Sequence, residues 1–152
     1  DTLAFTNRMM TTLNKAARDV MVRHQVHSCT DVTGFGLLGH SFEMAQGSDV
    51  TITLHVDGID LIPAALAFAR MGVLPAGMYR NRTFAEPGVD AGDTELCKQD
   101  LLYDPQTAGG LLMAVDPADA EVLYGELKGC VPSAQRIGVV REYRGGKRIF
   151  LR

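Results

Sequence analysis

A single run of residues, Thr30 to His40 (TDVTGFGLLGH), carries the side chains most suited to chemistry. Its glycines would let an anion approach the backbone, and a helix that begins there offers unpaired N–H groups and a partial positive charge. Thr33 adds a hydroxyl donor, and the carboxylate of Asp31 is a ligand that can hold Mg²⁺ against phosphate oxygens. The run therefore predicts a phosphate loop formed by Thr33, Gly34 and Gly36, with Asp31 as a metal ligand.

The residues of this run also fit two other interpretations. Gly34, Gly36 and Gly39 satisfy the GxGxxG pattern of dinucleotide sites, and Asp57 lies about where such a site needs an acid. However, the residues before Gly34 are too polar for the strand that should precede this pattern. A glycine turn that binds nothing explains the run equally well, and the Gly-Lys-Ser/Thr end of a Walker A loop does not follow. The residues alone leave the three interpretations open.

A second polar run, Asp104 to Gly110 (DPQTAGG), precedes an apolar segment. Asp and Pro commonly begin a turn and a glycine pair commonly closes one, so a structural turn is the simpler interpretation. The functional interpretation is a second polar loop that lines the same cleft as the first. In that case Gln106 and Thr107 are its candidate contacts.

The remaining candidates are weaker. The four histidines have no metal-ligand spacing, and His40 is expected to make a local hydrogen bond. Cys29 lies two residues before Asp31, but no base is recognisable beside it, so we expect a small buried thiol. Residues 79–82 (YRNR) could contact a phosphate, although a solvated loop is the simpler prediction.

The elements that must position these residues follow from hydrophobic periodicity and from the glycines and prolines. Together they predict an α+β fold, an α/β sandwich in which helices pack on a mixed β-sheet. The predicted elements are an amphipathic helix over Thr6–His24, a short strand or turn over Cys29–Val32, a helix over Phe35–Ala45, a strand over Val50–Val56, a helix over Ala64–Arg70, a long mobile loop over Leu74–Asp93, a short helix over Glu95–Leu102, a buried strand over Gly110–Val115, a helix over Ala118–Lys128, and a final hairpin of Ile137–Tyr143 with Lys147–Leu151.

The composition predicts one globular domain over residues 1–152, with 46% hydrophobic and 22% charged residues. The net charge of −3 argues against a broad nucleic-acid-binding face, and the apolar runs are too short to span a membrane. Three cysteines without a CxxC pair predict a reduced, cytoplasmic protein. The chain starts at Asp1 without an initiator Met, in a helix-like pattern, which indicates a fragment or a processed product.

Taken together, the two polar runs resemble the paired signature of the selenophosphate synthetases (selenide, water dikinases). The first is CTDVTGFGLLGH, and the second, nearer the C-terminus, is DPQTAGGLL, with Ala108 where this family usually has Ser. The likeness extends to MYRNR at residues 78–82 and to the terminal Gly145-Gly146 pair. It therefore spans nearly the whole chain.

This resemblance implies a fold like the C-terminal domain of aminoimidazole ribonucleotide synthetase. It also implies that the chain is the C-terminal half of a two-domain enzyme that converts ATP, selenide and water to selenophosphate, AMP and phosphate with Mg²⁺. In the family the Asp of TDVTGFG is a metal ligand, which here is Asp31. The catalytic residues belong to the N-terminal ATP-binding domain, which also forms the homodimer and is absent here, so we expect the chain alone to be inactive.

Two other functions stay open from the sequence. The chain could belong to another ATP-dependent enzyme of the same superfamily, although the DPQT run favours the selenide branch. It could also be a non-catalytic interaction domain that binds an anion incidentally.

Overall fold

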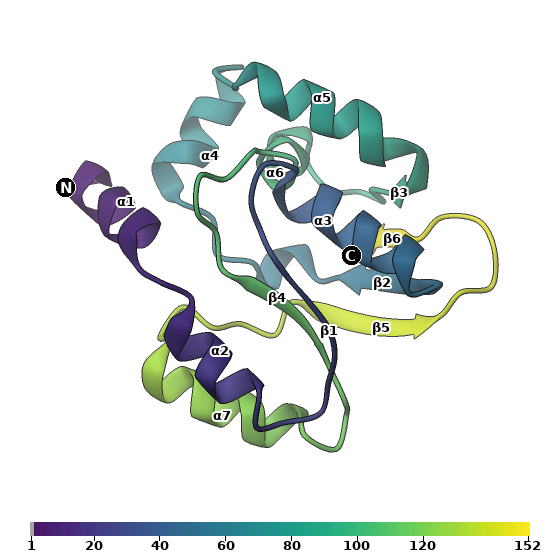
Figure 1. The fold of residues 1–152 in the computed structure, drawn as a ribbon. Helices are drawn as coiled ribbons and strands as arrows, with labels where there is room; N and C mark the ends of the chain where they lie inside the picture. The colour runs from purple at the N-terminus through teal and green to yellow at the C-terminus, as the bar shows by residue number, and fades with distance from the viewer. Residues whose placement is uncertain (1) are drawn as a thin grey trace.

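The computed structural model describes residues 2–152, and its helices and strands alternate along most of the chain (Figure 1). The elements are α1 (Thr2–Thr11), α2 (Lys15–Met21), β1 (Val26–Asp31), α3 (Gly36–Gly47), β2 (Val50–Leu54), the 3₁₀ turn η1 (Val56–Gly58), α4 (Pro63–Arg70), α5 (Ala76–Ala85), the 3₁₀ turn η2 (Glu86–Gly88), β3 (Val89–Asp90), α6 (Leu96–Leu102), β4 (Leu111–Val115), α7 (Ala120–Cys130), β5 (Gly138–Glu142) and β6 (Ile149–Leu151).

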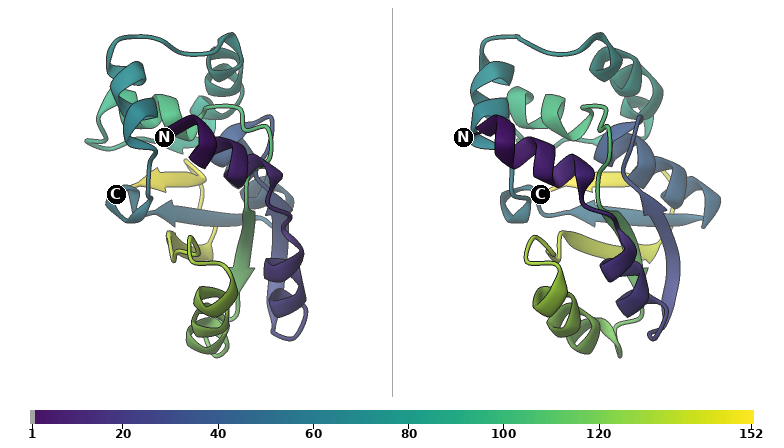
Figure 2. Two further views of the ribbon diagram at one scale, coloured as in Figure 1. Left: turned by 90° about the vertical axis from the view of Figure 1, so that its left-hand side faces the viewer. Right: turned by 60° about the vertical axis from the view of Figure 1, so that its left-hand side comes forward.

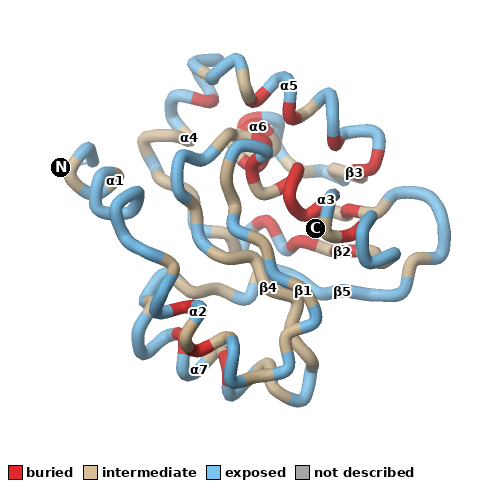
Figure 3. Tube along the Cα trace, in the orientation of Figure 1, coloured by how far each residue is buried: buried red, intermediate tan, exposed pale blue. Residues whose placement is uncertain are grey.

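The main layer is a four-stranded mixed sheet in the order β3-β6-β2-β5. Strand β6 runs parallel to both of its neighbours, and β5 runs antiparallel to β2. Helix α3 lies on β2 and β6, and α5 and α6 pack on α3 (Figure 1). The main core forms between these layers, around side chains such as Leu38, Leu54 and Ile149, which are almost completely buried. Figure 3 shows much of α3 in the colour of buried residues. The predicted α+β sandwich is therefore confirmed.

A separate antiparallel ribbon of β1 and β4 extends from this layer, with a register shift between Val26 and Ser28. Helices α2 and α7 lie side by side at one end of the ribbon (Figure 2). They enclose a second, smaller core of buried side chains, Ala17, Val20, Leu123 and Leu127. The ribbon therefore joins a large core to a small one, and its other end leads into α3.

The single helix predicted over Thr6–His24 is wrong, because the chain breaks between α1 and α2. Asn14 leaves the helical path, and its side-chain Nδ2 donates to the carbonyl of Gly109 at 3.0 Å. Helix α1 has no buried residue, so apolar side chains such as Phe5 and Met9 remain exposed. Apolar spacing alone therefore did not show that only the second half of this segment packs against a core.

The predicted loop over Leu74–Asp93 is also wrong, because it contains α5, η2 and β3. Pro75 precedes the first helical turn, where the missing N–H of proline costs nothing. Met78, Asn81 and Ala85 are buried at helical spacing. The polar composition of this segment hid a helix that is amphipathic over only a narrow face.

The predicted C-terminal hairpin is wrong as well. Strands β5 and β6 do not pair with each other, since both flank β2. Gly145 and Gly146 do form the connection, with positive φ values of 93° and 81°. Strand β4, predicted to be a buried strand, is half-buried throughout, and within residues 2–152 it pairs with β1 alone.

The helices predicted near residues 35–45, 64–70, 95–102 and 118–128 are confirmed as α3, α4, α6 and α7. The strand predicted at Val50–Val56 is confirmed as β2, which ends at Leu54, and the last predicted residue, Val56, begins η1. Among residues 2–152, none of the helices combines the length and the apolar character that crossing a membrane requires.

Candidate functional site

The first polar run forms the turn from β1 into α3. The turn closes with a hydrogen bond from the Gly36 N–H to the Thr33 carbonyl at 3.0 Å. Gly36 has a φ of +70°, and a Cβ at this position would lie 2.8 Å from backbone atoms of Tyr103 and Asp104. Glycine is therefore required here by both backbone conformation and space.

The second polar run lies directly against the first. The N–H of Gln106 donates to the Thr33 carbonyl at 3.0 Å, and the N–H of Gly109 donates to the Val32 carbonyl at 3.0 Å. The Val32 N–H in turn donates to the Gly110 carbonyl at 2.9 Å. The ladder of the β1–β4 ribbon thus continues into both loops and holds them side by side.

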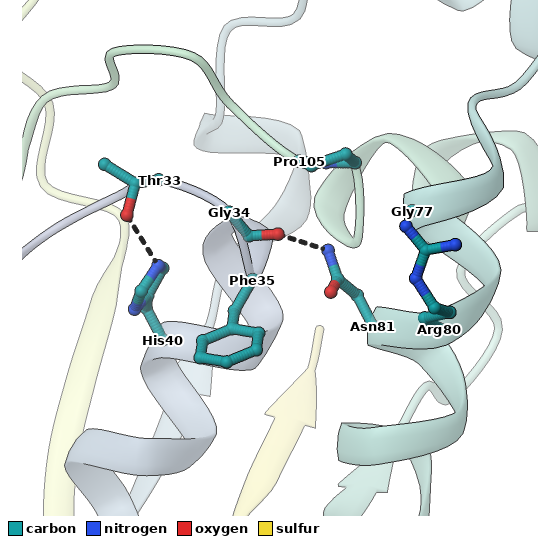
Figure 4. A pocket seen from close by; sticks show the side chains of 8 residues that line it. All are labelled: Thr33, Gly34, Phe35, His40, Gly77, Arg80, Asn81 and Pro105. Atoms are coloured by element: carbon teal, nitrogen blue, oxygen red, sulfur yellow. Dashed lines mark hydrogen bonds between the residues drawn. The ribbon is translucent and has the colours of Figure 1, made fainter.

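A pocket of about 570 Å³ opens between the first loop and helix α5 (Figure 4). Of the predicted residues, Thr33 and Gly34 line this pocket, whereas Gly36 is buried beneath it. Gln106 and Thr107 are exposed and lie outside its lining. The other lining residues are Phe35, His40, Gly77, Arg80, Asn81 and Pro105.

Asp31 faces a different hollow. This surface depression of about 600 Å³ is also lined by Lys15, Arg18 and Cys29, among others. Within residues 2–152 there is no group of three or more His, Cys, Asp or Glu residues that could hold a metal ion. The Asp31 carboxylate fits Mg²⁺ as one oxygen ligand, and the remaining ligands would have to come from water, a phosphate or another protein segment.

Cys29 is exposed rather than buried, which corrects the sequence prediction. Partial burial, and then the negative charge of Asp31, raise the pKa of its thiol. A raised pKa reduces the thiolate fraction, so the local environment does not activate this sulfur as a nucleophile.

Sequence reasoning missed the structural role of Asn81, which it had named only as one of residues 79–82 that could contact a phosphate. Its buried side chain on α5 donates one Nδ2–H to the Gly34 carbonyl at 2.8 Å and the other to the Tyr103 carbonyl at 2.9 Å (Figure 4). One amide group therefore links the first loop, helix α5 and the end of α6. The only sequence signal was the position of Asn81 within MYRNR, a segment predicted to be solvated.

His40 makes the local hydrogen bond that was predicted. Its Nε2 lies 3.3 Å from the Thr33 hydroxyl, and its Nδ1 lies 3.2 Å from the Glu43 carboxylate. Because a carboxylate accepts, a neutral His40 ring donates through Nδ1 and accepts the Thr33 proton at Nε2. An anion in the pocket would compete with His40 for that proton.

In the second loop, Gln106 is occupied locally. Its Nε2 donates to the Asp104 carboxylate at 2.8 Å. Burial raises the pKa of Asp104, and this hydrogen bond offsets part of the rise. The Gln106 side chain therefore supports its own turn in this structure.

The model of a protein family, the AIR synthase related protein C-terminal domain, matches residues 4–150, so the chain belongs to this family. Within that class, the chain is similar to several proteins named selenide, water dikinase. The protein from Clostridium botulinum is 42% identical over 147 residues, which cover 95% of this chain and 42% of the relative. Those from Treponema denticola and Caldanaerobacter subterraneus are 44% and 47% identical over 120 and 119 residues, which cover 79% and 78% of this chain. These matches span only 34% to 42% of the length of the three relatives.

Proposed function

We propose that residues 1–152 are the C-terminal half of a two-domain selenide, water dikinase. The complete enzyme would convert ATP, selenide and water to selenophosphate, AMP and phosphate. The main supporting observation is that the two signature-like runs, far apart in sequence, are hydrogen-bonded to each other beside one pocket. The similarity to relatives that carry this name supports the same assignment.

In this proposal the chain contributes contacts rather than the reacting groups. Asp31, at the end of β1, supplies one carboxylate ligand to Mg²⁺, and the N-terminal domain supplies the others. Thr33, Gly34 and Gly36 form the loop that faces phosphate, and Gln106 and Thr107 belong to the adjoining loop. The bound Mg²⁺ would neutralise charge on the phosphate oxygens. The paired loops would keep Asp31 and the phosphate contacts in fixed relative positions.

No residue of this chain is assigned a catalytic role. One carboxylate and one loop cannot align a magnesium-bound triphosphate for transfer, so the chain alone should be inactive. Its partners in this proposal are its own N-terminal domain, a second copy in a homodimer, ATP and selenide, in the cytoplasm.

The test is ³¹P NMR of the longer protein, in which this chain follows its N-terminal half. The sample contains ATP, Mg²⁺ and selenide under anaerobic conditions, and the 152-residue chain serves as the control. We expect selenophosphate and AMP from the longer protein and unchanged ATP from the chain. Unchanged ATP from a folded longer protein would refute the assignment.

A pair of variants tests the role of Asp31. Asp31→Asn in the longer protein should raise the Mg²⁺ concentration for half-maximal turnover by about tenfold or more, since a metal ligand is lost. Asp60→Asn is the matched control, because Asp60 is also exposed and its carboxylate has no partner within residues 2–152. An unchanged Mg²⁺ dependence in Asp31→Asn would favour the non-catalytic, anion-binding domain instead.

A further inference from the structure

Arg80 carries a charge that the fold does not use. It lies on the exposed side of α5, lines the pocket beside the first loop, and makes no hydrogen bond or ion pair within residues 2–152. Two residues further on, Arg82 bonds to Asp100 and lies over the ring of Tyr103. The two arginines on the same helix thus differ, because Arg82 holds the fold together and Arg80 only faces the pocket.

The pocket wall offers nothing to neutralise Arg80. None of its lining residues is Asp or Glu. The first turn of α5 lies against the second loop, since a Cβ on Gly77 would be 2.9 Å from Pro105. An unpaired guanidinium in a water-accessible cavity without carboxylates attracts anions.

Backbone donors lie on the opposite wall of the same pocket. The N–H groups of Gly34 and Phe35 donate to no acceptor within residues 2–152. They stand in the turn just before α3, and the carbonyl of Gly34 is fixed by Asn81. Figure 4 shows Gly34 and Phe35 on one side of the pocket and Arg80 on the other, so donors come from two elements.

Asp31 does not line this pocket, so an anion bound here would not need a metal held by that residue. We propose that the pocket is a direct, metal-independent site for a phosphate-type oxyanion, held by Arg80 and by the N–H groups of Gly34 and Phe35. The inference deepens the proposed function and rests on it only for the source of the anion. That source is either free inorganic phosphate or the terminal phosphate of ATP.

The test is a titration of the ¹⁵N-labelled 152-residue chain with inorganic phosphate, at constant ionic strength with EDTA present. We expect saturable shifts of the Gly34 and Phe35 amides. Arg80→Gln should raise the dissociation constant for phosphate by about tenfold or more, because it removes a hydrogen bond between charged groups. Arg141→Gln, which removes an exposed arginine on β5 without a partner within residues 2–152, should bind as the unmodified chain does.

Equal binding by the two variants would overturn the proposal, as would shifts that need Mg²⁺ and disappear in Asp31→Asn. Because the Arg80 side chain makes no hydrogen bond or ion pair within residues 2–152, Arg80→Gln should unfold at the same urea concentration as Arg141→Gln. A second titration with magnesium-free ATP identifies the source, since the ligand that saturates the same amides at lower concentration is the one preferred. These readouts need no turnover, so failure of this site and failure of the dikinase assignment are separate results.

Discussion

Replacing Asn81 by Ala should destabilise the fold strongly, because this one side chain ties helix α5 to the first loop and to the end of α6. The change removes two hydrogen bonds and leaves the carbonyls of Gly34 and Tyr103 without these donors. The Gly34 carbonyl can recover a bond to water, so its loss costs about 1 kcal/mol. The Tyr103 carbonyl belongs to a residue that is only 1% exposed, and its loss costs about 2 kcal/mol. The better helix propensity of Ala returns about 0.5 kcal/mol, which leaves a net loss of about 2.5 kcal/mol.

Urea unfolding of the 152-residue chain measures this loss directly, as a lower midpoint with an unchanged slope. Thr83→Ala is the matched control, since Thr83 lies on the same helix, is exposed, and bonds only to the Tyr79 carbonyl within its own helix. That control should change the unfolding free energy by no more than about 0.5 kcal/mol. If Asn81→Ala also stays within that limit, the two hydrogen bonds do not stabilise the packing of α5 on the first loop and the end of α6.

Three further predictions concern stability. Gly36→Ala should lower the free energy of unfolding by about 3 kcal/mol, because a Cβ there is strained and overlaps the backbone of Tyr103 and Asp104. Gly34→Ala, where a Cβ would meet no atom within 4 Å, should lower it by less than about 1 kcal/mol. Thermal unfolding of the two variants compares these losses. Asp100→Ala should lower the free energy of unfolding by about 2 kcal/mol in urea unfolding, because Arg82 loses its buried carboxylate partner and keeps only the exposed Glu86 as an ion-pair partner. The His24 ring, whose Nε2 lies 3.4 Å from the Glu126 carboxylate, and then the Arg23 guanidinium lower the pKa of Glu126. The stability from this carboxylate is therefore complete above its ordinary pKa of 4.5 and is lost as the pH falls through its lowered pKa. Urea midpoints between about pH 3 and pH 6 should therefore fall less steeply in Glu126→Gln than in the unmodified chain.

Local patterns predicted the elements whose burial is decided by their own spacing. Helices α3 and α7 and strand β2 fall where the apolar residues recur with a period of 3.6 or 2. The pairing of the last strands could not be found this way, since nearness in sequence favours a hairpin. In the structure β6 lies between β3 and β2, where Ile149 and Leu151 are at most 1% exposed. This burial between two parallel neighbours depends on segments far away in the chain.

The candidate site shows the same limit. The residues of the first polar run, Thr30 to His40, predicted a turn and the start of a helix, and the structure contains both. They did not show which contacts hold the turn in place. The partners of Asn81 are backbone carbonyls, which every residue possesses, so no pattern in the sequence marks them. Gly36 was selected because an anion could approach it, yet the structure requires glycine there for φ and for contact with Tyr103 and Asp104. A loss of binding in a Gly36 variant would therefore not separate folding from phosphate contact. A change at Arg80 does separate them, because its side chain makes no hydrogen bond or ion pair within residues 2–152.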